Sequence, residues 1–158
     1  MALSRLDALD KKIIRALARD GRLSASELAE RLDVTPPTIR SRIKSLQESG
    51  SFKICGLLDT FYHQEITVAL IGLNVRSYGR LDEILNKVAE LENVTWASVV
   101  TGRYDILAEV VFTGGTATLY RITAGMIPQV GEVLSSESFV IMKSVNKWTC
   151  LPQDFDDW

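Results

Sequence analysis

The chain of 158 residues is long enough for one ordinary domain or two small ones and too short for a large catalytic barrel. Hydrophobic residues make up 46% and charged residues 24%, proportions that are typical of globular proteins and unlike those of disordered chains. No apolar run reaches the roughly 18 residues that a membrane span needs, and charges occupy the place of a signal peptide's apolar segment. We therefore expect a globular, cytoplasmic protein that does not enter a membrane.

Charge is distributed unevenly along the sequence. Residues 1–55 hold eleven Lys and Arg against seven Asp and Glu, a net of +4, and the remainder holds seven against thirteen, a net of −6. Because phosphate attraction acts through local charge, the basic first part favours contact with a polyanion. Two ordinary solvated surfaces are the alternative interpretation.

Apolar periodicity predicts two short helices at the start of the chain. The first follows Asp7, carries apolar residues at helical spacing from Leu9 to Leu17, and is expected to end at a left-handed Gly21. The second begins at a capping box formed by Ser24 and Glu27 and is only about two turns long.

A third helix is expected after a brief connection. Thr35 is its predicted cap, Pro36 takes the first position, where a missing N–H costs nothing, and Gly50 ends it. An apolar stripe, made by Ile39, Ile43 and Leu46, faces the first two helices. Two short helices joined by a tight turn are typical of a helix-turn-helix.

The opposite face of the third helix is polar, small and basic. Its candidate DNA-binding residues are Thr35, Pro37, Thr38, Arg40, Ser41, Arg42, Lys44 and Ser45. Small hydroxyl residues allow a helix to approach base edges, and Arg and Lys reach phosphates or guanine. An ordinary solvated helix face is the alternative. Residues 51–55 predict a short strand, either a wing or a connector.

The rest of the chain alternates strands and helices. Strands are expected over residues 66–75, 94–100 and 106–112, with helices over 81–91, before Asn93, and over 117–127, closed by Pro128. A final strand is indicated by Val130, Val133, Leu134 and residues 138–143. The order βαββαβ is the ferredoxin-like arrangement, so the fold class is α+β, with an N-terminal helix-turn-helix domain that is winged-helix-like. We expect that domain over 1–55, a connector over 56–65, the ferredoxin-like domain over 66–150 and an acidic tail over 151–158.

The uncovered face of such a sheet needs a partner. Helices cover only one side of a ferredoxin-like sheet, and the strands here are apolar on both sides. We therefore expect this face to be buried in a homodimer.

Two segments of the chain are specific enough to be compared with known families. One is LDALDKKIIRALARDGRLSASELAERLDVTPPTIRSRIKSLQESG, and the other is VVTGRYDI between the second and third strands. Joined in this order, they resemble the Lrp/AsnC (feast/famine) family of prokaryotic transcription regulators. The likeness covers roughly residues 5–150. Its most specific parts are the Asp10-to-Gly50 spacing, the Arg42-x-x-x-Leu46-x-x-x-Gly50 segment and the GRYD turn. The resemblance implies binding of double-stranded DNA, dimers that often assemble into octamers, and an amino-acid-type effector near the turn.

The candidate effector-binding residues are those of the turn, Thr101, Gly102, Arg103, Tyr104 and Asp105. Backbone amides at Gly102 are suited to the effector's carboxylate and Asp105 to its ammonium. Arg103 either pairs with Asp105 or receives the ligand carboxylate. A purely structural turn, in which Tyr104 packs and Asp105 caps nearby amides, is the other interpretation.

Two other function classes remain as alternatives. One is an architectural DNA-binding protein that responds to no effector. The other is an enzyme of similar architecture, such as the siroheme decarboxylases that resemble the family, for which His63 is the candidate base. Cys55 and Cys150 form no metal-ligand cluster, and the sequence holds no P-loop, dinucleotide fingerprint or GxSxG elbow, so we expect no metal, no cofactor and no catalysis.

Overall fold

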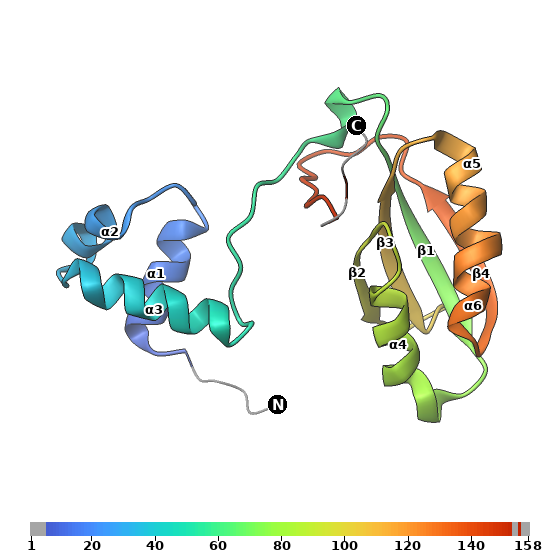
Figure 1. Cartoon of the computed structure of the whole chain (residues 1–158), viewed down its shortest axis with the longest axis horizontal. Coiled ribbons are helices and arrows are strands. Elements are labelled where there is room, and N and C mark those ends of the chain that lie inside the picture. Colours follow the sequence, from blue (N-terminus) through green and yellow to red (C-terminus); the bar gives the residue numbers. More distant parts are fainter. Residues whose placement is uncertain (1–5, 153–154, 156–158) are drawn as a thin grey trace. The chain divides into compact units, whose positions relative to one another are not determined.

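The computed structural model describes residues 6–152 and residue 155. The chain divides into two compact units, Met1–Gly56 and Leu57–Trp158 (Figure 1). No helix within the described ranges is long and apolar enough to cross a membrane. The acidic tail expected over residues 151–158 lies largely outside the described residues.

Three helices form the N-terminal unit: α1 (Ala8–Leu17), α2 (Ala25–Leu32) and α3 (Pro36–Glu48). Reciprocal capping boxes begin the first two, with Asp7 and Asp10 at α1 and Ser24 and Glu27 at α2. The three helices share a core around Ile13, Leu28 and Ile39, whose side chains are fully buried, and Leu46 of the predicted stripe is also buried.

The turn between α2 and α3 confirms the helix-turn-helix. Asp33 ends α2 in the left-handed conformation, with φ 54° and ψ 51°, and the Val34 amide donates to the Ala29 carbonyl at 3.0 Å. This sharp turn allows α3 to pack across α2.

Two local predictions for this unit are wrong. Helix α1 ends at Leu17 with a right-handed Ala18, so Gly21 does not supply its stop. Residues 51–55 form no strand, since the described part of this unit offers no strand for them to pair with. Thr35 is the N-cap residue of α3, with Pro36 next, as predicted, but its side chain accepts from no amide; its hydroxyl pairs with that of Thr38 at 2.9 Å.

The C-terminal unit is a four-stranded antiparallel sheet with helices on one side (Figure 1). The strand order β2-β3-β1-β4 confirms the ferredoxin-like arrangement. The elements are η1 (Thr60–Tyr62), β1 (Thr67–Val75), η2 (Tyr78–Arg80), α4 (Leu81–Ala89), β2 (Val94–Val99), β3 (Ile106–Phe112), α5 (Gly115–Tyr120), the π-helix η3 (Arg121–Met126), α6 (Ile127–Val130) and β4 (Val133–Val140).

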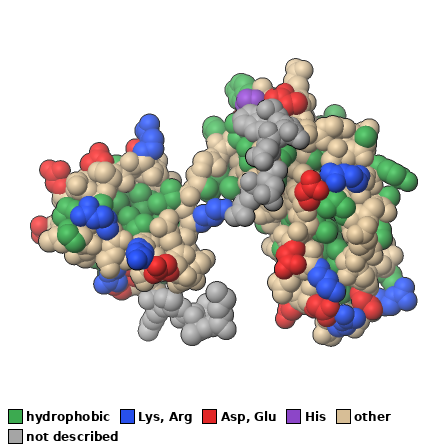
Figure 2. Space-filling model, viewed as in Figure 1, with side chains coloured by type: hydrophobic (Ala, Val, Ile, Leu, Met, Phe, Trp, Pro, Cys, Tyr) green, Lys and Arg blue, Asp and Glu red, His purple; other side chains and the backbone are tan. Residues whose placement is uncertain are grey.

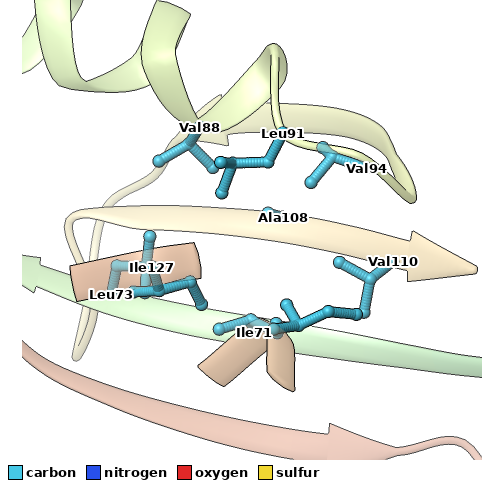
Figure 3. Close-up of a pocket in the computed structure, with 9 residues that line it drawn as sticks. Ile71, Leu73, Val88, Leu91, Val94, Ala108, Val110 and Ile127 are labelled. Carbon is cyan, nitrogen blue, oxygen red and sulfur yellow. The ribbon is translucent and has the colours of Figure 1, made fainter. Parts of the chain in front are cut away.

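The main core of this unit lies between the sheet and its helices. Alternate residues of β1 and β3 point into it, and Ile84, Val88, Ile122 and Ile127 meet them from the helices. An apolar cavity of about 10 Å³ remains there (Figure 3). It is too small to admit an amino acid, so the core itself is not an effector site.

The structure corrects the sequence interpretation in the last part of the sheet unit. Strand β4 covers Val133–Val140, so Val133 and Leu134 belong to it as predicted, whereas Val130 ends α6 and residues 141–143 lie beyond the strand. Pro128 does not close the helix: it lies in the first turn of α6. The π-helix before it changes the hydrogen bonding, and the Thr123 hydroxyl donates to the Leu119 carbonyl at 2.9 Å.

We call the other side of the sheet the open face. Strand register and alternation place on it Val68, Leu70 and Gly72 from β1, Leu107, Glu109 and Val111 from β3, Glu137 and Phe139 from β4, and Trp96 from β2. Val68 and Val111 are buried, whereas Trp96 and Phe139 are exposed by 41% and 42%. One end of the open face is therefore covered, and the other end is not.

The cover is made by segments that flank the sheet in sequence. Leu58, Ile141 and Leu151 pack against Val68 and Val111, and Leu58 pairs with Thr149 in an isolated antiparallel bridge. The Lys147 ammonium lies 2.5 Å from a Glu109 carboxylate oxygen, and the Thr95 hydroxyl donates to the other oxygen at 2.9 Å. An ion pair that is mostly shielded from solvent therefore ties the C-terminal segment to the open face.

Candidate functional sites

The outer face of α3 is the first candidate site. Of its eight predicted residues, Thr35, Pro37, Arg40, Ser41, Lys44 and Ser45 are exposed, and Thr38 and Arg42 are half-buried. Helix α3 holds them in place through Ile39 and Leu46, which are buried on its opposite side. The structure therefore brings the predicted residues onto one solvent-facing region of a single helix.

Arg42 differs from the other basic residues of α3. Its guanidinium lies 2.5 Å from the Asp7 carboxylate and 3.3 Å from that of Asp10, at the N-terminus of α1. The Asp10 side chain is only 12% exposed. The pKa of Asp7 is lowered, first by the hydrogen bond from the Asp10 amide and further by Arg42. Arg42 thus joins α3 to α1.

The remaining cations of α3 are available to a polyanion. Lys44 makes only a loose, solvated pair with Glu48, at 3.7 Å, and Arg40 has no ion pair among the described residues. Figure 2 shows Lys and Arg side chains and carboxylates interspersed over the visible surface of this unit, around a group of hydrophobic side chains. Because carboxylates separate the cations on this surface, a polyanion would be attracted by individual Lys and Arg side chains and not by one continuous positive patch.

The second candidate site is the turn between β2 and β3. The Val100 amide donates to the Asp105 carbonyl at 3.0 Å, and the Asp105 amide donates to Leu73 of β1 at 2.9 Å. Gly102 has a φ of +122°, which strongly favours glycine. Thr101, Gly102 and Arg103 are exposed. The β-sheet thus presents the five predicted effector residues together in one tight turn.

The Asp105 carboxylate is already hydrogen-bonded on both oxygens. One oxygen accepts from the Val75 amide at 2.8 Å, and the other accepts from the Tyr78 hydroxyl at 2.5 Å. These bonds, the one from Tyr78 first, lower the pKa of Asp105. Asp105 is therefore an anion at neutral pH, and it joins the turn to β1 and η2.

Arg103 and Tyr104 both bind Glu137 of β4. The Arg103 guanidinium lies 3.0 Å from the Glu137 carboxylate, to which the Tyr104 hydroxyl also donates a hydrogen bond. That hydrogen bond raises the pKa of Tyr104. Of the two roles predicted for Arg103, the pair with Asp105 is not formed, since Glu137 pairs with the guanidinium.

The Tyr104 ring lies on the open face, over Gly72. A Cβ on Gly72 would stand 2.6 Å from Tyr104 Cγ, so only glycine leaves room for the ring. Phe139 meets the same ring edge-on, with 6.0 Å between ring centroids. The Tyr104 ring therefore joins the β2–β3 turn to the uncovered end of the open face.

Two backbone amides of the turn are available to bind an anion. Among the described residues, the backbone amides of Gly102 and Arg103 donate to no other backbone group. Successive free amides in a turn bind carboxylates and phosphates, and the ionised Asp105 lies next to them. The arrangement therefore suits a small molecule that carries both charges.

His63, the candidate base, follows η1, and its ring nitrogen lies 3.7 Å from the Glu65 carboxylate. Within residues 6–152 and 155, no cluster of His, Cys, Asp and Glu is able to hold a metal ion. Cys55 and Cys150 are present as thiols.

Sequence reasoning missed Tyr78, Glu137 and Gly72. Each lies at least 23 residues from the nearest residue of the turn, and only the pairing of β1 with β3 and β4 brings them to it. No local pattern marks Tyr78, which follows β1 in a short helical turn. Gly72 had a weaker signal, because a glycine inside an apolar strand often marks close approach of another group.

Family comparisons match both units. The AsnC-type helix-turn-helix domain matches residues 6–47, and the Lrp/AsnC ligand binding domain matches residues 68–149. An uncharacterised HTH-type transcriptional regulator of Pyrococcus furiosus is 32% identical over 146 residues, which are 90% of this chain and 95% of the relative. The regulatory protein AsnC of Haemophilus influenzae is 29% identical over 140 residues, 88% of this chain and 93% of its own.

A solved structure agrees with these matches. The chain is similar to a transcriptional regulator of Neisseria meningitidis solved as a complex with L-Met, with a TM-score of 0.68 and 25% identity. The similarity covers 95% of this chain and 98% of that one. Sequence and fold therefore point to the same group of proteins.

Proposed function

Because the chain belongs to the Lrp/AsnC family of transcriptional regulators, with a helix-turn-helix DNA-binding domain and a ligand-binding domain, we propose that it reads specific DNA sequences through α3 and senses an amino acid at the β2–β3 turn. It acts as a homodimer or a higher assembly, in the cytoplasm, and catalyses no reaction. The carrying observation is that the same fold presents an exposed polar helix face and a turn with free amides beside an ionised carboxylate.

DNA binding rests on the exposed residues of α3. In a dimer, the two α3 helices would enter successive major grooves, about 34–36 Å apart, on a pseudo-palindromic site. Arg40 and Lys44 bind phosphates, and Thr38 and Ser41 read base edges. Arg42 is left out of this contact set, because its guanidinium is engaged by Asp7 and Asp10.

Binding to genomic DNA fragments at several salt concentrations tests this assignment. Arg40→Ala should weaken binding to all fragments and reduce the salt slope by about one. Ser41→Ala should alter the preference among fragments more than the mean affinity. Equal losses on every fragment for Ser41→Ala would remove its base-reading role, and selective binding by neither the parent nor the variants would refute the DNA proposal.

Effector binding rests on the polarity of the turn. The free amides of Gly102 and Arg103 receive the ligand carboxylate, and Asp105 receives the ammonium. The neighbour crystallised with L-Met makes methionine the first ligand to try. Calorimetric titration with L-methionine and the other standard L-amino acids tests the proposal, and Asp105→Asn should abolish the binding. Retained binding in that variant would remove Asp105 from the site.

The uncovered end of the open face supports self-association. Trp96 and Phe139 stand exposed beside half-buried Leu70 and Leu107, and no helix in the described part of the chain covers them. A second copy would bury these side chains around a twofold axis. Sedimentation equilibrium of Phe139→Glu should give a monomer, whereas Tyr120→Glu, on the helix side, should leave the mass unchanged.

A second candidate function is an architectural DNA-binding protein without an effector. It is favoured by the internal partners of Arg103, Tyr104 and Asp105, which leave no polar side chain of these three unengaged. Binding to DNA fragments with no heat of binding for any amino acid would support this candidate.

A further inference from the structure

Tyr78 is hydrogen-bonded to the Asp105 carboxylate, which is the group that the proposed effector's ammonium would bind. Its hydroxyl donates to one Asp105 oxygen at 2.5 Å, while the other Asp105 oxygen is held by the Val75 amide. The backbone bond is part of the fold, since Val75 belongs to β1. Only the oxygen bound by Tyr78 can therefore be freed by a side-chain movement.

The Tyr78 side chain is able to leave. The residue is 72% exposed, and its other surroundings are the short turn η2 between β1 and α4. Rotation of the ring into solvent breaks one exposed hydrogen bond and disturbs no core residue. Exposed side chains change rotamer within picoseconds to nanoseconds, so the exchange is fast relative to ligand binding.

Charge favours replacement of the phenol by an ammonium. The hydrogen bond to Asp105 raises the pKa of Tyr78, so the phenol stays neutral at pH 7, and Asp105 stays ionised. A neutral O–H donor on a carboxylate is weaker than a cationic N–H donor. A ligand with a primary ammonium therefore competes successfully for the oxygen, and a ligand with a blocked amine does not.

We infer that Tyr78 is a built-in competitor of the effector: it donates to Asp105 when the site is empty and is displaced by the ligand's ammonium. This inference rests on the proposed effector site at the turn. Tyr78 then sets the effector concentration at which the sensor responds, because the effector binds only after the hydrogen bond between Tyr78 and Asp105 has broken. It also restricts the ligands to molecules with a free, protonated amine.

Displacement also changes what holds η2 to the β2–β3 turn. The Tyr78 carbonyl accepts from the amide of Leu81, the first residue of α4, and this backbone bond does not depend on the Tyr78 hydroxyl. Effector binding therefore removes the side-chain contact between the β2–β3 turn and η2 without altering the core.

Calorimetric titration of Tyr78→Phe tests the inference. The variant removes the hydroxyl and keeps the exposed ring, so its fold should be intact, as a thermal unfolding scan will check. For the amino acid that binds the parent, the Kd should fall about tenfold. One hydrogen bond to a charged group keeps the parent's site closed to the ligand for most of the time, and the variant lacks that bond. Tyr120→Phe is the matched control, because Tyr120 is 73% exposed and its hydroxyl makes no hydrogen bond with any described side chain. Its Kd should equal that of the parent.

The outcomes separate the inference from the proposed function. If the Kd of Tyr78→Phe is unchanged or higher than that of the parent, and Asp105→Asn still loses binding, the competitor role is overturned and the effector site stands. Binding retained in Asp105→Asn, or no binding of any standard amino acid by parent and variants, would overturn both. Binding of the N-acetylated amino acid with equal affinity would also overturn the competitor role, since that ligand has no ammonium.

Discussion

The Tyr104 ring lies so close to Gly72 that a methyl group on residue 72 would stand 2.6 Å from Tyr104 Cγ and 2.7 Å from both Cδ atoms. These atoms form the base of the ring, which moves only if the whole side chain moves. The ring is also held by Phe139 and by the Tyr104 hydrogen bond to Glu137. A strand glycine therefore fixes where the turn meets the sheet.

Gly72→Ala should destabilise the C-terminal unit by about 1–3 kcal/mol, the usual cost of overpacking a well-packed site. Urea unfolding followed by tryptophan fluorescence measures this change. Gly125→Ala is the control: a Cβ there meets nothing within 4 Å and its φ is not positive, so the change should be neutral or stabilising. Equal stabilities of the two variants would show that the Tyr104 ring moves aside without cost.

Arg42→Met should lower the thermal stability of the N-terminal unit and leave the salt slope of DNA binding unchanged. The substitution leaves Asp10, whose side chain is 12% exposed, without its cationic partner. Arg40→Met is the matched comparison, since Arg40 is exposed on the same helix and should reduce the slope by about one with little loss of stability. A reduced slope for Arg42→Met would instead make Arg42 a phosphate contact.

Lys147→Met should destabilise the protein by about 3–5 kcal/mol, because it leaves a buried carboxylate without its cation. Glu109 is only 5% exposed, and its remaining partner is the Thr95 hydroxyl. The double variant Lys147→Met/Glu109→Gln should recover much of the loss, since the buried charge is then gone. Chemical unfolding of the three variants gives the comparison, and an additive double variant would contradict a direct pairing.

Stability should fall in acid partly through Glu83. Hydrogen bonds from Arg80, and then from Lys87, lower the pKa of Glu83 from 4.5 to about 2. Because the folded-state pKa is the lower one, the contribution is complete above about pH 4.5 and is lost as the pH falls toward about 2. Thermal midpoints across this window should fall less steeply for Glu83→Gln than for the parent. Glu90→Gln, an exposed change close to the end of the same helix, should follow the parent curve.

The sequence predicted the elements better than their contacts. Strands over 67–75 and 106–112 and the helix-turn-helix followed from apolar periodicity and capping residues, which act over a few positions. The bounds of β4 were less exact: Val130 belongs to α6, and Ile141, which is apolar like the strand residues, packs instead against Val68 and Val111 beyond the strand's end.

The partners of the candidate sites depend on distant residues. Arg42 has the sequence pattern of a DNA contact, and only the packing of α3 on α1 brings it to Asp7 and Asp10. Tyr78 reaches Asp105 because β1 and β3 are neighbours in the sheet. Single-sequence reasoning identifies residue types suited to a task, but it does not show which of them the fold has already engaged.

Although Leu58 precedes β1, Ile141, Lys147 and Leu151 of the cover over one end of the open face come after all four strands in the chain. During synthesis the strands therefore leave the ribosome before these three residues, and until they arrive Val68 and Val111 have only part of their cover and Glu109 lacks its cation. A nascent sheet in this state is prone to premature association with other chains. The order of the sequence thus gives the newly made protein a brief interval in which its future buried surface is accessible to chaperones.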